Sequence, residues 1–182
     1  MKIVQSPLAD VYIIEPLVHV DERGYFFESY RSDIFEKEIR EIEFIQSNES
    51  KSSKGTLRGL HYQLNPRAQS KLVRVIEGSM FDVVVDIRKE STNFGKWFGL
   101  ELSGENKKQL FIPQGFAHGF LVLSETVLVQ YQVDEYYSKE NDRGIKFDDS
   151  DISIDWPDVD SEILLSDKDQ QQPAFKDAEV FA

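Results

Sequence analysis

The sequence contains no cysteine, only three histidines and no long hydrophobic run. Without cysteine there are no disulfides, thiolate nucleophiles or thiolate metal ligands. No apolar segment approaches the roughly 18 residues of a membrane span, and the N-terminus lacks the apolar centre of a signal peptide. The 33 acidic and 21 basic side chains give a net charge of -12, whereas a nucleic-acid partner requires a basic face. These absences predict a cytoplasmic protein without a nucleic-acid or membrane partner, and leave a small ligand possible.

The chain of 182 residues, 40% of them hydrophobic, fits one domain over residues 1–182. The segment Glu77-Gly78-Ser79 predicts a hairpin turn. One helix is predicted at residues 33–40, with Ser32 as its N-cap. Short extended segments separated by Gly, Pro, Asn and Ser predict a mainly β, antiparallel jelly-roll barrel with a few short helices. The expected strands cover residues 11–14, 24–30, 72–76, 80–87, 97–102, 109–112, 120–123 and 127–133.

The segment TLRGLHYQ at residues 56–63 places Arg58 and His61 three positions apart between apolar residues. Alternate side chains of a strand share a face, so an ideal strand would send these two to opposite faces. Both can reach one cavity only if Gly59 allows a bulge or bend between them. We therefore expect this strand to be distorted at Gly59 and to form a functional surface.

The histidines are His19, His61 and His118, and the last lies in a Pro-x-Gly-x-x-His pattern that resembles the second signature of the cupin superfamily. Metal-binding cupins carry two histidines one residue apart in the first signature, but here Gln63 stands in place of the second. Two histidines without a third imidazole or a clear carboxylate make a poor transition-metal site. The sequence therefore predicts no metal and no other cofactor, and favours acid–base chemistry.

A neutral imidazole such as that of His61 can accept a proton near pH 7. Asp169 is a candidate carboxylate to orient its second ring nitrogen. Tyr131 shares a strand face with Val129 and Val133 and is a candidate acid. A base and an acid on opposite sides of one ligand are what an epimerase requires.

Several longer motifs resemble those of the dTDP-4-dehydrorhamnose 3,5-epimerase family, and the resemblance extends from about residue 3 to residue 169. These motifs are DERGYFFE at 21–28, QSNES at 46–50, GTLRGLHYQ at 55–63, KLVRV at 71–75, DVVVDIR at 82–88, IPQGFAHGF at 112–120 and LSDKD at 165–169. The resemblance implies a metal-free homodimeric jelly roll. Its implied substrate is dTDP-4-dehydro-6-deoxy-D-glucose, and its implied pathway is dTDP-L-rhamnose and surface polysaccharide biosynthesis.

The resemblance also implies roles for individual residues. His61 matches the base that removes protons from C3 and C5, and Tyr131 matches the acid on the other side. Asp169 matches the carboxylate that orients His61, and Lys71 matches a cation near the C4 oxygen, where negative charge develops. The remaining matches are ligand contacts: Arg23, Glu28, Gln46, Asn48, Arg58, His118, Tyr137, Asp142 and Lys168.

Some of these positions depart from the family pattern. Lys168 stands where members often have arginine, and Asp142 where glutamate is common. Tyr136 lies beside Tyr137, so a one-residue slip would exchange the two. Three alternatives stay open at this point: an epimerase of C3 only or of a GDP- or CDP-linked keto sugar, a non-catalytic nucleotide-sugar-binding protein, and a metal-dependent cupin.

Overall fold

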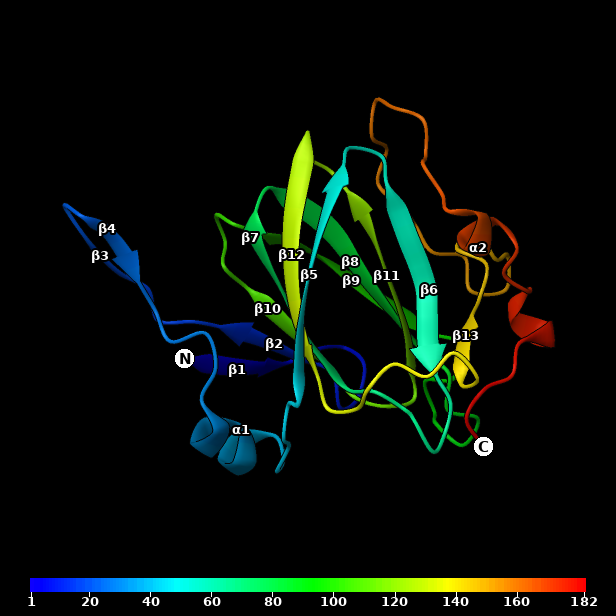
Figure 1. The fold of residues 1–182 in the computed structure, drawn as a ribbon. Coiled ribbons are helices and arrows are strands. Elements are labelled where there is room, and N and C mark those ends of the chain that lie inside the picture. Colours follow the sequence, from blue (N-terminus) through cyan, green and yellow to red (C-terminus); the bar gives the residue numbers. More distant parts are fainter.

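The computed structural model describes residues 1–182 and shows two antiparallel β-sheets packed face to face as a jelly roll (Figure 1). One sheet has six strands in the order β1-β2-β10-β7-β12-β5, and the other has five in the order β13-β6-β11-β8-β9. A separate two-stranded hairpin, β3-β4, projects away from this sandwich. The predicted antiparallel jelly roll with a few short helices is confirmed.

The elements have the following bounds. The six-stranded sheet consists of β1 (Lys2–Gln5), β2 (Tyr12–Glu15), β10 (Gln109–Ile112), β7 (Lys71–Glu77), β12 (Thr126–Val133) and β5 (Gln46–Ser53). The five-stranded sheet consists of β13 (Asp142–Gly144), β6 (Leu57–Gln63), β11 (Phe116–Val122), β8 (Ser79–Asp86) and β9 (Trp97–Ser103). The hairpin is β3 (His19–Asp21) and β4 (Gly24–Phe26), and the helices are α1 (Ser32–Glu38), α2 (Asp167–Gln170) and the 3-10 turn Phe175–Asp177.

The hairpin predicted at residues 77–79 is wrong. Strands β7 and β8 are separated by Gly78 alone and lie in different sheets. Gly78 has a φ of +80°, and a Cβ on it would lie 2.0 Å from the Thr126 carbonyl oxygen, so only glycine fits this corner. A single intervening residue cannot form the two-residue loop of a tight hairpin, and the chain crosses to the opposite sheet instead.

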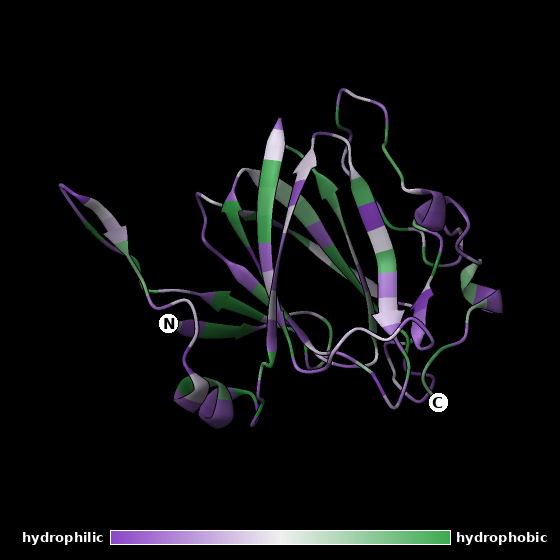
Figure 2. Ribbon diagram, viewed as in Figure 1, coloured by the Kyte–Doolittle hydropathy of each residue, from purple (hydrophilic) through white to green (hydrophobic).

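The core lies between the two sheets. Its largest cluster joins Val73 and Val75 of β7, Val127 and Val129 of β12, and Val84 of β8 with nine further buried residues. Hydrophobic residues gather on the strands, and the two α-helices are mostly hydrophilic (Figure 2). Because side chains alternate along a strand, inward residues such as Val129 and Tyr131 share one face of β12.

Helix α1 differs from its prediction at both ends. It begins at Ser32, Arg31 occupies the N-cap position, and no side chain caps it, so the proposed Ser32 cap is wrong. The helix is held instead by Phe35, which is fully buried and packs on Ile14, Leu72 and Phe111. Packing of one apolar face outweighs the absent cap.

The β3-β4 hairpin, called the arm below, presents two different faces. One face carries Val20 and Tyr25, which pair directly, and the Tyr25 ring lies 3.9 Å from the Lys107 ammonium. Just after the arm, the Phe27 ring lies 5.5 Å from the Arg74 guanidinium. Val20 is 77% exposed, and Phe26, on the opposite face because it pairs with His19, is 67% exposed. Each face of the arm therefore carries an exposed apolar side chain that is not buried within the chain.

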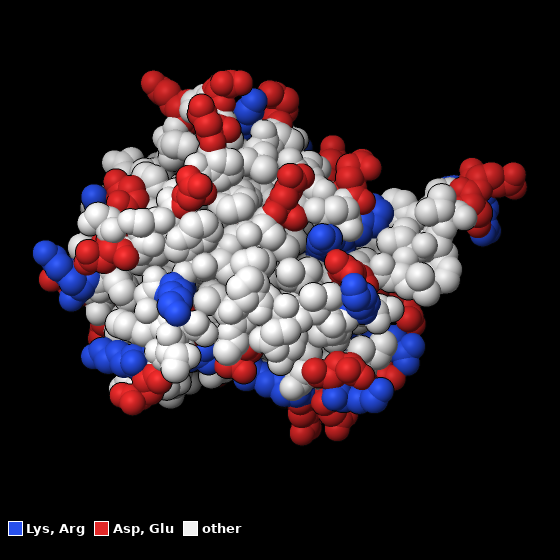
Figure 3. All heavy atoms as spheres, turned by 180° about the vertical axis from the view of Figure 1, so that it is seen from behind, with Lys and Arg blue, Asp and Glu red and all other residues white.

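Charged side chains are mixed over the surface. The view from behind shows acidic and basic groups scattered around a broad uncharged area, without a continuous basic patch (Figure 3). Both α-helices are too short to cross a membrane.

Candidate active site

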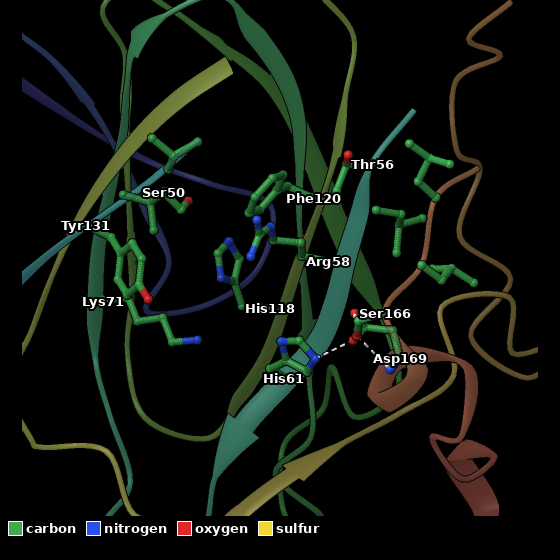
Figure 4. Close-up of a pocket in the computed structure, with 15 residues that line it drawn as sticks. Ser50, Thr56, Arg58, His61, Lys71, His118, Phe120, Tyr131, Ser166 and Asp169 are labelled. Atoms are coloured by element: carbon green, nitrogen blue, oxygen red, sulfur yellow. Dashed lines mark hydrogen bonds and ion pairs between the residues drawn. The ribbon is translucent and has the colours of Figure 1, made fainter. Parts of the chain in front are cut away.

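One cavity of about 470 Å³ opens between the two sheets. The six-stranded sheet provides one wall, and β6, β11 and the segment before and within α2 provide the other (Figure 4). The lining residues are Ser50, Thr56, Leu57, Arg58, His61, Lys71, Val73, His118, Phe120, Val129, Tyr131, Leu164, Leu165, Ser166 and Asp169. All four residues predicted to be catalytic are among them, although their roles stay predictions.

His61, in the middle of β6, forms a short hydrogen bond to Asp169. Its Nε2 lies 2.5 Å from Asp169 Oδ1. The second oxygen of Asp169 accepts a hydrogen bond from the Ser166 hydroxyl at 2.6 Å. Because an ionised carboxylate only accepts hydrogen bonds, His61 Nε2 carries the proton and Nδ1 keeps its lone pair. His61 is thereby arranged to accept a proton through Nδ1.

Asp169 is held at the start of a short helix. Its backbone N–H donates to the Ser166 hydroxyl, which acts as the N-cap of α2. Burial alone would raise the pKa of Asp169, but the hydrogen bonds from His61 and Ser166 outweigh burial and leave the pKa below its ordinary value. The carboxylate is therefore ionised near pH 7 and can stabilise a protonated His61.

A distortion of β6 brings Arg58 to the same cavity as His61. Gly59 has a φ of +137°, and the pairing of β6 with β11 shifts register between His118 and Phe120. Arg58 lines the cavity and donates from Nε to the Ser52 hydroxyl at 3.1 Å. The bend expected at Gly59 is therefore present in the strand.

Tyr131 and Lys71 reach the cavity from the six-stranded sheet, opposite His61 (Figure 4). They come from neighbouring strands, β12 and β7, in which Tyr131 pairs with Val73 and Lys71 with Val133. Burial raises the pKa of Tyr131, while the positive charge of Arg58 acts in the opposite direction. The phenol is therefore protonated near pH 7 and can donate a proton.

Lys71 is the cation most strongly affected by burial. Burial lowers its pKa to about 8, although the carboxylates of Asp82 and Asp142 oppose this change. Near pH 7 the side chain is mostly an ammonium that is poorly solvated. Such a charge interacts strongly with negative charge that develops on a bound ligand.

His118 forms a second histidine–carboxylate pair. It faces His61 across the β6-β11 ladder, and its Nε2 lies 2.6 Å from Asp82 Oδ1. Burial lowers the pKa of His118, so the ring is neutral near pH 7. Sequence-based prediction selected His118 but missed Asp82. The available signal was an acidic residue within the otherwise apolar run 80–85 of a strand.

Tyr137, Asp142 and Lys168 form a cluster outside the cavity lining. Asp142 Oδ2 accepts from the Tyr137 hydroxyl at 3.0 Å and lies 2.5 Å from Lys168 Nζ. Gln63 supports the loop before this cluster, because it donates to the Tyr136 carbonyl and accepts from the Ser138 amide. The glutamine at the missing cupin histidine position thus has a structural role.

Gln46 and Asn48 point to the same side of β5 as the cavity residue Ser50, because all three have the same parity. Asn48 pairs with Tyr131 in the β5-β12 ladder. The Gln46 side-chain amide donates to Asn48 Oδ1 at 2.6 Å. These two predicted contacts therefore extend the polar surface of the six-stranded sheet next to the cavity.

Arg23 and Glu28 are separated from this cavity in the single chain. Arg23 lies at the tip of the arm, has 85% of its side chain exposed and pairs with Asp21. Glu28 follows the arm and lies 3.5 Å from Arg31. The structure does not bring these two predicted ligand contacts to the other site residues of the same chain.

The arrangement supports proton transfer on two sides of a bound ligand. His61, backed by Asp169, faces the cavity from one sheet, and Tyr131 and Lys71 face it from the other. No three His, Asp or Glu side chains gather as potential metal ligands, and the absence of a metal remains a prediction. Sequence-based prediction also missed the supporting residue Ser166 and the apolar wall residues Phe120, Leu164 and Leu165.

Comparison with known proteins places these observations in a family. The family model for dTDP-4-dehydrorhamnose 3,5-epimerase matches residues 5–177. The dTDP-4-dehydrorhamnose 3,5-epimerase of Shigella flexneri is 53% identical over 182 residues, covering 100% of this chain and 99% of the relative.

Two crystal structures show the same fold. The dTDP-4-dehydrorhamnose 3,5-epimerase of Elizabethkingia anophelis is 54% identical, with a TM-score of 0.93 and 97% coverage of each chain. The dTDP-6-deoxy-D-glucose-3,5-epimerase of Legionella pneumophila, in complex with dTDP-4-keto-L-rhamnose, is 44% identical. Its TM-score is 0.92, and the match covers 96% of this chain and 93% of the relative.

Proposed function

The chain belongs to the dTDP-4-dehydrorhamnose 3,5-epimerase family, a family of isomerases, and from this premise we propose that it inverts C3 and C5 of dTDP-4-dehydro-6-deoxy-D-glucose. The product is dTDP-4-dehydro-L-rhamnose, an intermediate of dTDP-L-rhamnose and surface polysaccharide biosynthesis. In this proposal, residues 1–182 form a single epimerase domain. The reaction takes place in the cytoplasm and uses no cofactor.

The observation that carries this proposal is the placement of His61 and Tyr131 on opposite walls of one cavity. Inversion of a carbon requires that a proton leave from one face and return to the other. His61 Nδ1 takes the proton, while Asp169 stabilises the imidazolium that forms. Tyr131 then returns a proton from the opposite side.

The C4 ketone makes the protons on C3 and C5 acidic, because the carbanion spreads onto the carbonyl oxygen as an enolate. Lys71, on the same wall as Tyr131, provides the positive charge for that oxygen. A fixed, poorly solvated ammonium interacts more favourably with the negatively charged enolate than with the neutral ketone. It therefore lowers the activation barrier for proton removal.

The remaining predicted contacts hold the nucleotide. Tyr137 provides an exposed ring, 62% of it open, for the thymine base, and Asp142 and Lys168 lie beside it. Arg58 and His118 contact the sugar or phosphate inside the cavity, and Gln46 and Asn48 contact the ligand next to it. Guanidinium groups suit the pyrophosphate, because they donate two parallel hydrogen bonds.

The active form is a homodimer in which the arm of one subunit reaches the cavity of the other. The support is the exposed apolar side chains of the arm and the position of Arg23 and Glu28 away from their own cavity. Contact of both faces of the arm with a second copy would bury Val20 and Phe26. The same contact would bring Arg23 to the partner's ligand.

Product analysis tests the proposed reaction. The protein is incubated with dTDP-4-dehydro-6-deoxy-D-glucose, the keto sugars are reduced with borohydride, and the released sugars are identified. We expect rhamnose and 6-deoxytalose of the L series, which require inversion at both carbons. Release of 6-deoxyallose and 6-deoxygulose of the D series alone would show inversion at C3 only, and recovery of the unchanged configuration would contradict the proposal.

A further inference from the structure

Asp82 is a fully buried carboxylate that the proposed reaction does not use. It lies in the middle of β8, where it pairs with Phe120 of β11 and Leu100 of β9. Its side chain is 0% exposed. Oδ1 lies 2.6 Å from His118 Nε2, but Oδ2 has no hydrogen-bond partner. Burying a carboxylate costs free energy that one hydrogen bond does not offset, so the charge must have a further favourable interaction.

Lys71 lines the same cavity as His118, the hydrogen-bond partner of Asp82, and is a cation that Asp82 attracts. Burial lowers the pKa of Lys71, and attraction to Asp82 is the strongest effect that opposes burial. Asp142 attracts Lys71 less strongly and already pairs with Lys168, which repels Lys71. The other titratable groups around this space are His61 and Arg58 on β6, His118 on β11, Tyr131 on β12 and Asp169 on α2.

Asp82 also fixes the tautomer of His118. A carboxylate accepts hydrogen bonds and cannot donate them, so His118 Nε2 must carry a hydrogen. Because burial keeps the ring neutral, Nδ1 is left as an acceptor. His118 lines the cavity, and this acceptor suits a sugar hydroxyl.

We propose that Asp82 is a positioning residue that acts on the reaction through two cavity residues, keeping Lys71 an ammonium and His118 the neutral Nε2–H tautomer. The part that concerns Lys71 rests on the proposed function, in which Lys71 faces the enolate oxygen. Asp82 itself has no contact with the ligand, because it is completely enclosed between β9 and β11.

The test is Asp82→Asn, which preserves shape and removes the charge. Without the charge, the pKa of Lys71 falls further, and the ammonium is lost at lower pH. We expect the alkaline limb of the kcat/KM profile to move from near pH 8 to lower values by about one pH unit. We also expect kcat to fall about tenfold or more, while KM changes less.

Asp86→Asn is the matched control. Asp86 is also a buried carboxylate of β8, but it is held by Arg88 and Ser91 and lies outside the cavity lining. This control should lose stability and keep the wild-type alkaline limb. An unshifted limb in Asp82→Asn, or an equal shift in both variants, would overturn the proposal.

Magnetic resonance of the unmodified protein keeps the inference testable if Asp82→Asn does not fold. The ¹⁵N shifts of the three histidines report their tautomers, and His118 should be the Nε2–H form. A predominant Nδ1–H form would overturn the proposal. This readout needs no substrate, so a protein inactive on the keto sugar would contradict the proposed function without changing this result.

Discussion

At the scale of single residues, Tyr131 and His61 have different roles in the proposed reaction. His61 has a carboxylate behind its ring, whereas Tyr131 lies on the other sheet, and burial raises the pKa of its phenol. The first is suited to remove a proton and the second to return one. Proton removal and net inversion should therefore be separable.

Tyr131→Phe should separate them. His61 still removes protons in this variant, so substrate hydrogen continues to exchange with solvent within about tenfold of the wild-type rate. Product formation should fall about 100-fold or more, because the acid is missing. The measurement is the ratio of deuterium incorporation to product formed.

Tyr137→Phe is the control, because it retains a ring beside Asp142 and removes only one hydroxyl. It should change KM and leave the ratio of exchange to turnover unchanged. If Tyr131→Phe also leaves this ratio unchanged, Tyr131 is a packing residue.

Lys71 makes a prediction about stability. Its pKa is about 8 in the folded chain against an ordinary value of 10.5. The unfolded chain therefore binds this proton more tightly, so the buried ammonium opposes folding below pH 8, and this cost disappears as the pH rises to 10.5.

Lys71→Met should raise the free energy of unfolding at pH 7 by up to about 3 kcal/mol while activity is lost. The gain should vanish above pH 10.5. Denaturant unfolding at several pH values measures this gain in the free energy of unfolding. The control is Lys51→Met, because Lys51 is exposed, and its free energy of unfolding should stay within about 0.5 kcal/mol of wild type. A destabilising Lys71→Met would contradict the account of this lysine.

At the scale of elements, strand β6 positions the proposed base His61, and the geometry of this strand depends on Gly59. A Cβ on Gly59 would lie 2.5 Å from the Cα of Gly119, so the backbones of β6 and β11 are too close for any side chain. The distortion turns Arg58 to the cavity that holds His61.

Gly59→Ala should destabilise the protein by more than about 4 kcal/mol, because a strained φ is combined with a backbone clash. Gly95→Ala is the control: its φ is also positive, at +75°, but the nearest atom is in the movable Phe175 side chain at 3.1 Å. The control should lose only about 1 to 3 kcal/mol. Thermal unfolding compares them, and equal losses would show that the β6-β11 approach is unimportant.

Sequence patterns predicted the strands better than their connections. The segment at residues 109–112 matches β10, and the alternation in β12 correctly gave the inward face of Tyr131. The same local patterns read Gly78 as a hairpin turn, because a glycine between two strands looks alike whether the chain turns back or crosses to another sheet.

The residues of the candidate site that lie within one strand were predictable from the sequence, whereas their distant partners were not. His61 and Tyr131 stand out because polar residues interrupt apolar strands. Asp82 interacts with His118 over 36 positions of sequence, and Ser166 matters only through Asp169. Such pairings arise from sheet order and from a helix cap, which local periodicity does not encode.

At the scale of the whole molecule, the two sheets form opposite walls of the cavity in which the proposed reaction takes place. The five-stranded sheet carries the proposed base, and the six-stranded sheet carries the proposed acid and cation. The arm carries Arg23 away from this body, and in the proposed homodimer a second copy of the chain would bring Arg23 to the site.

Mixing two inactive variants tests this assembly. If Arg23 acts on the partner's site, a dimer of His61→Ala with Arg23→Ala contains one site with both residues intact. Co-expression of the two variants should then restore up to about a quarter of wild-type activity, since half of the dimers are mixed and half of their sites are complete. Activity no higher than that of the separately purified variants would place Arg23 in its own subunit's site or outside the reaction.

The most direct measurement of the central claim is proton magnetic resonance of dTDP-4-dehydro-6-deoxy-D-glucose with the wild-type protein in deuterated water. Two-sided proton transfer predicts that the C3 and C5 proton signals both disappear as deuterium enters from solvent. Persistence of both signals under conditions in which the sugar nucleotide binds would contradict the account and favour a binding protein.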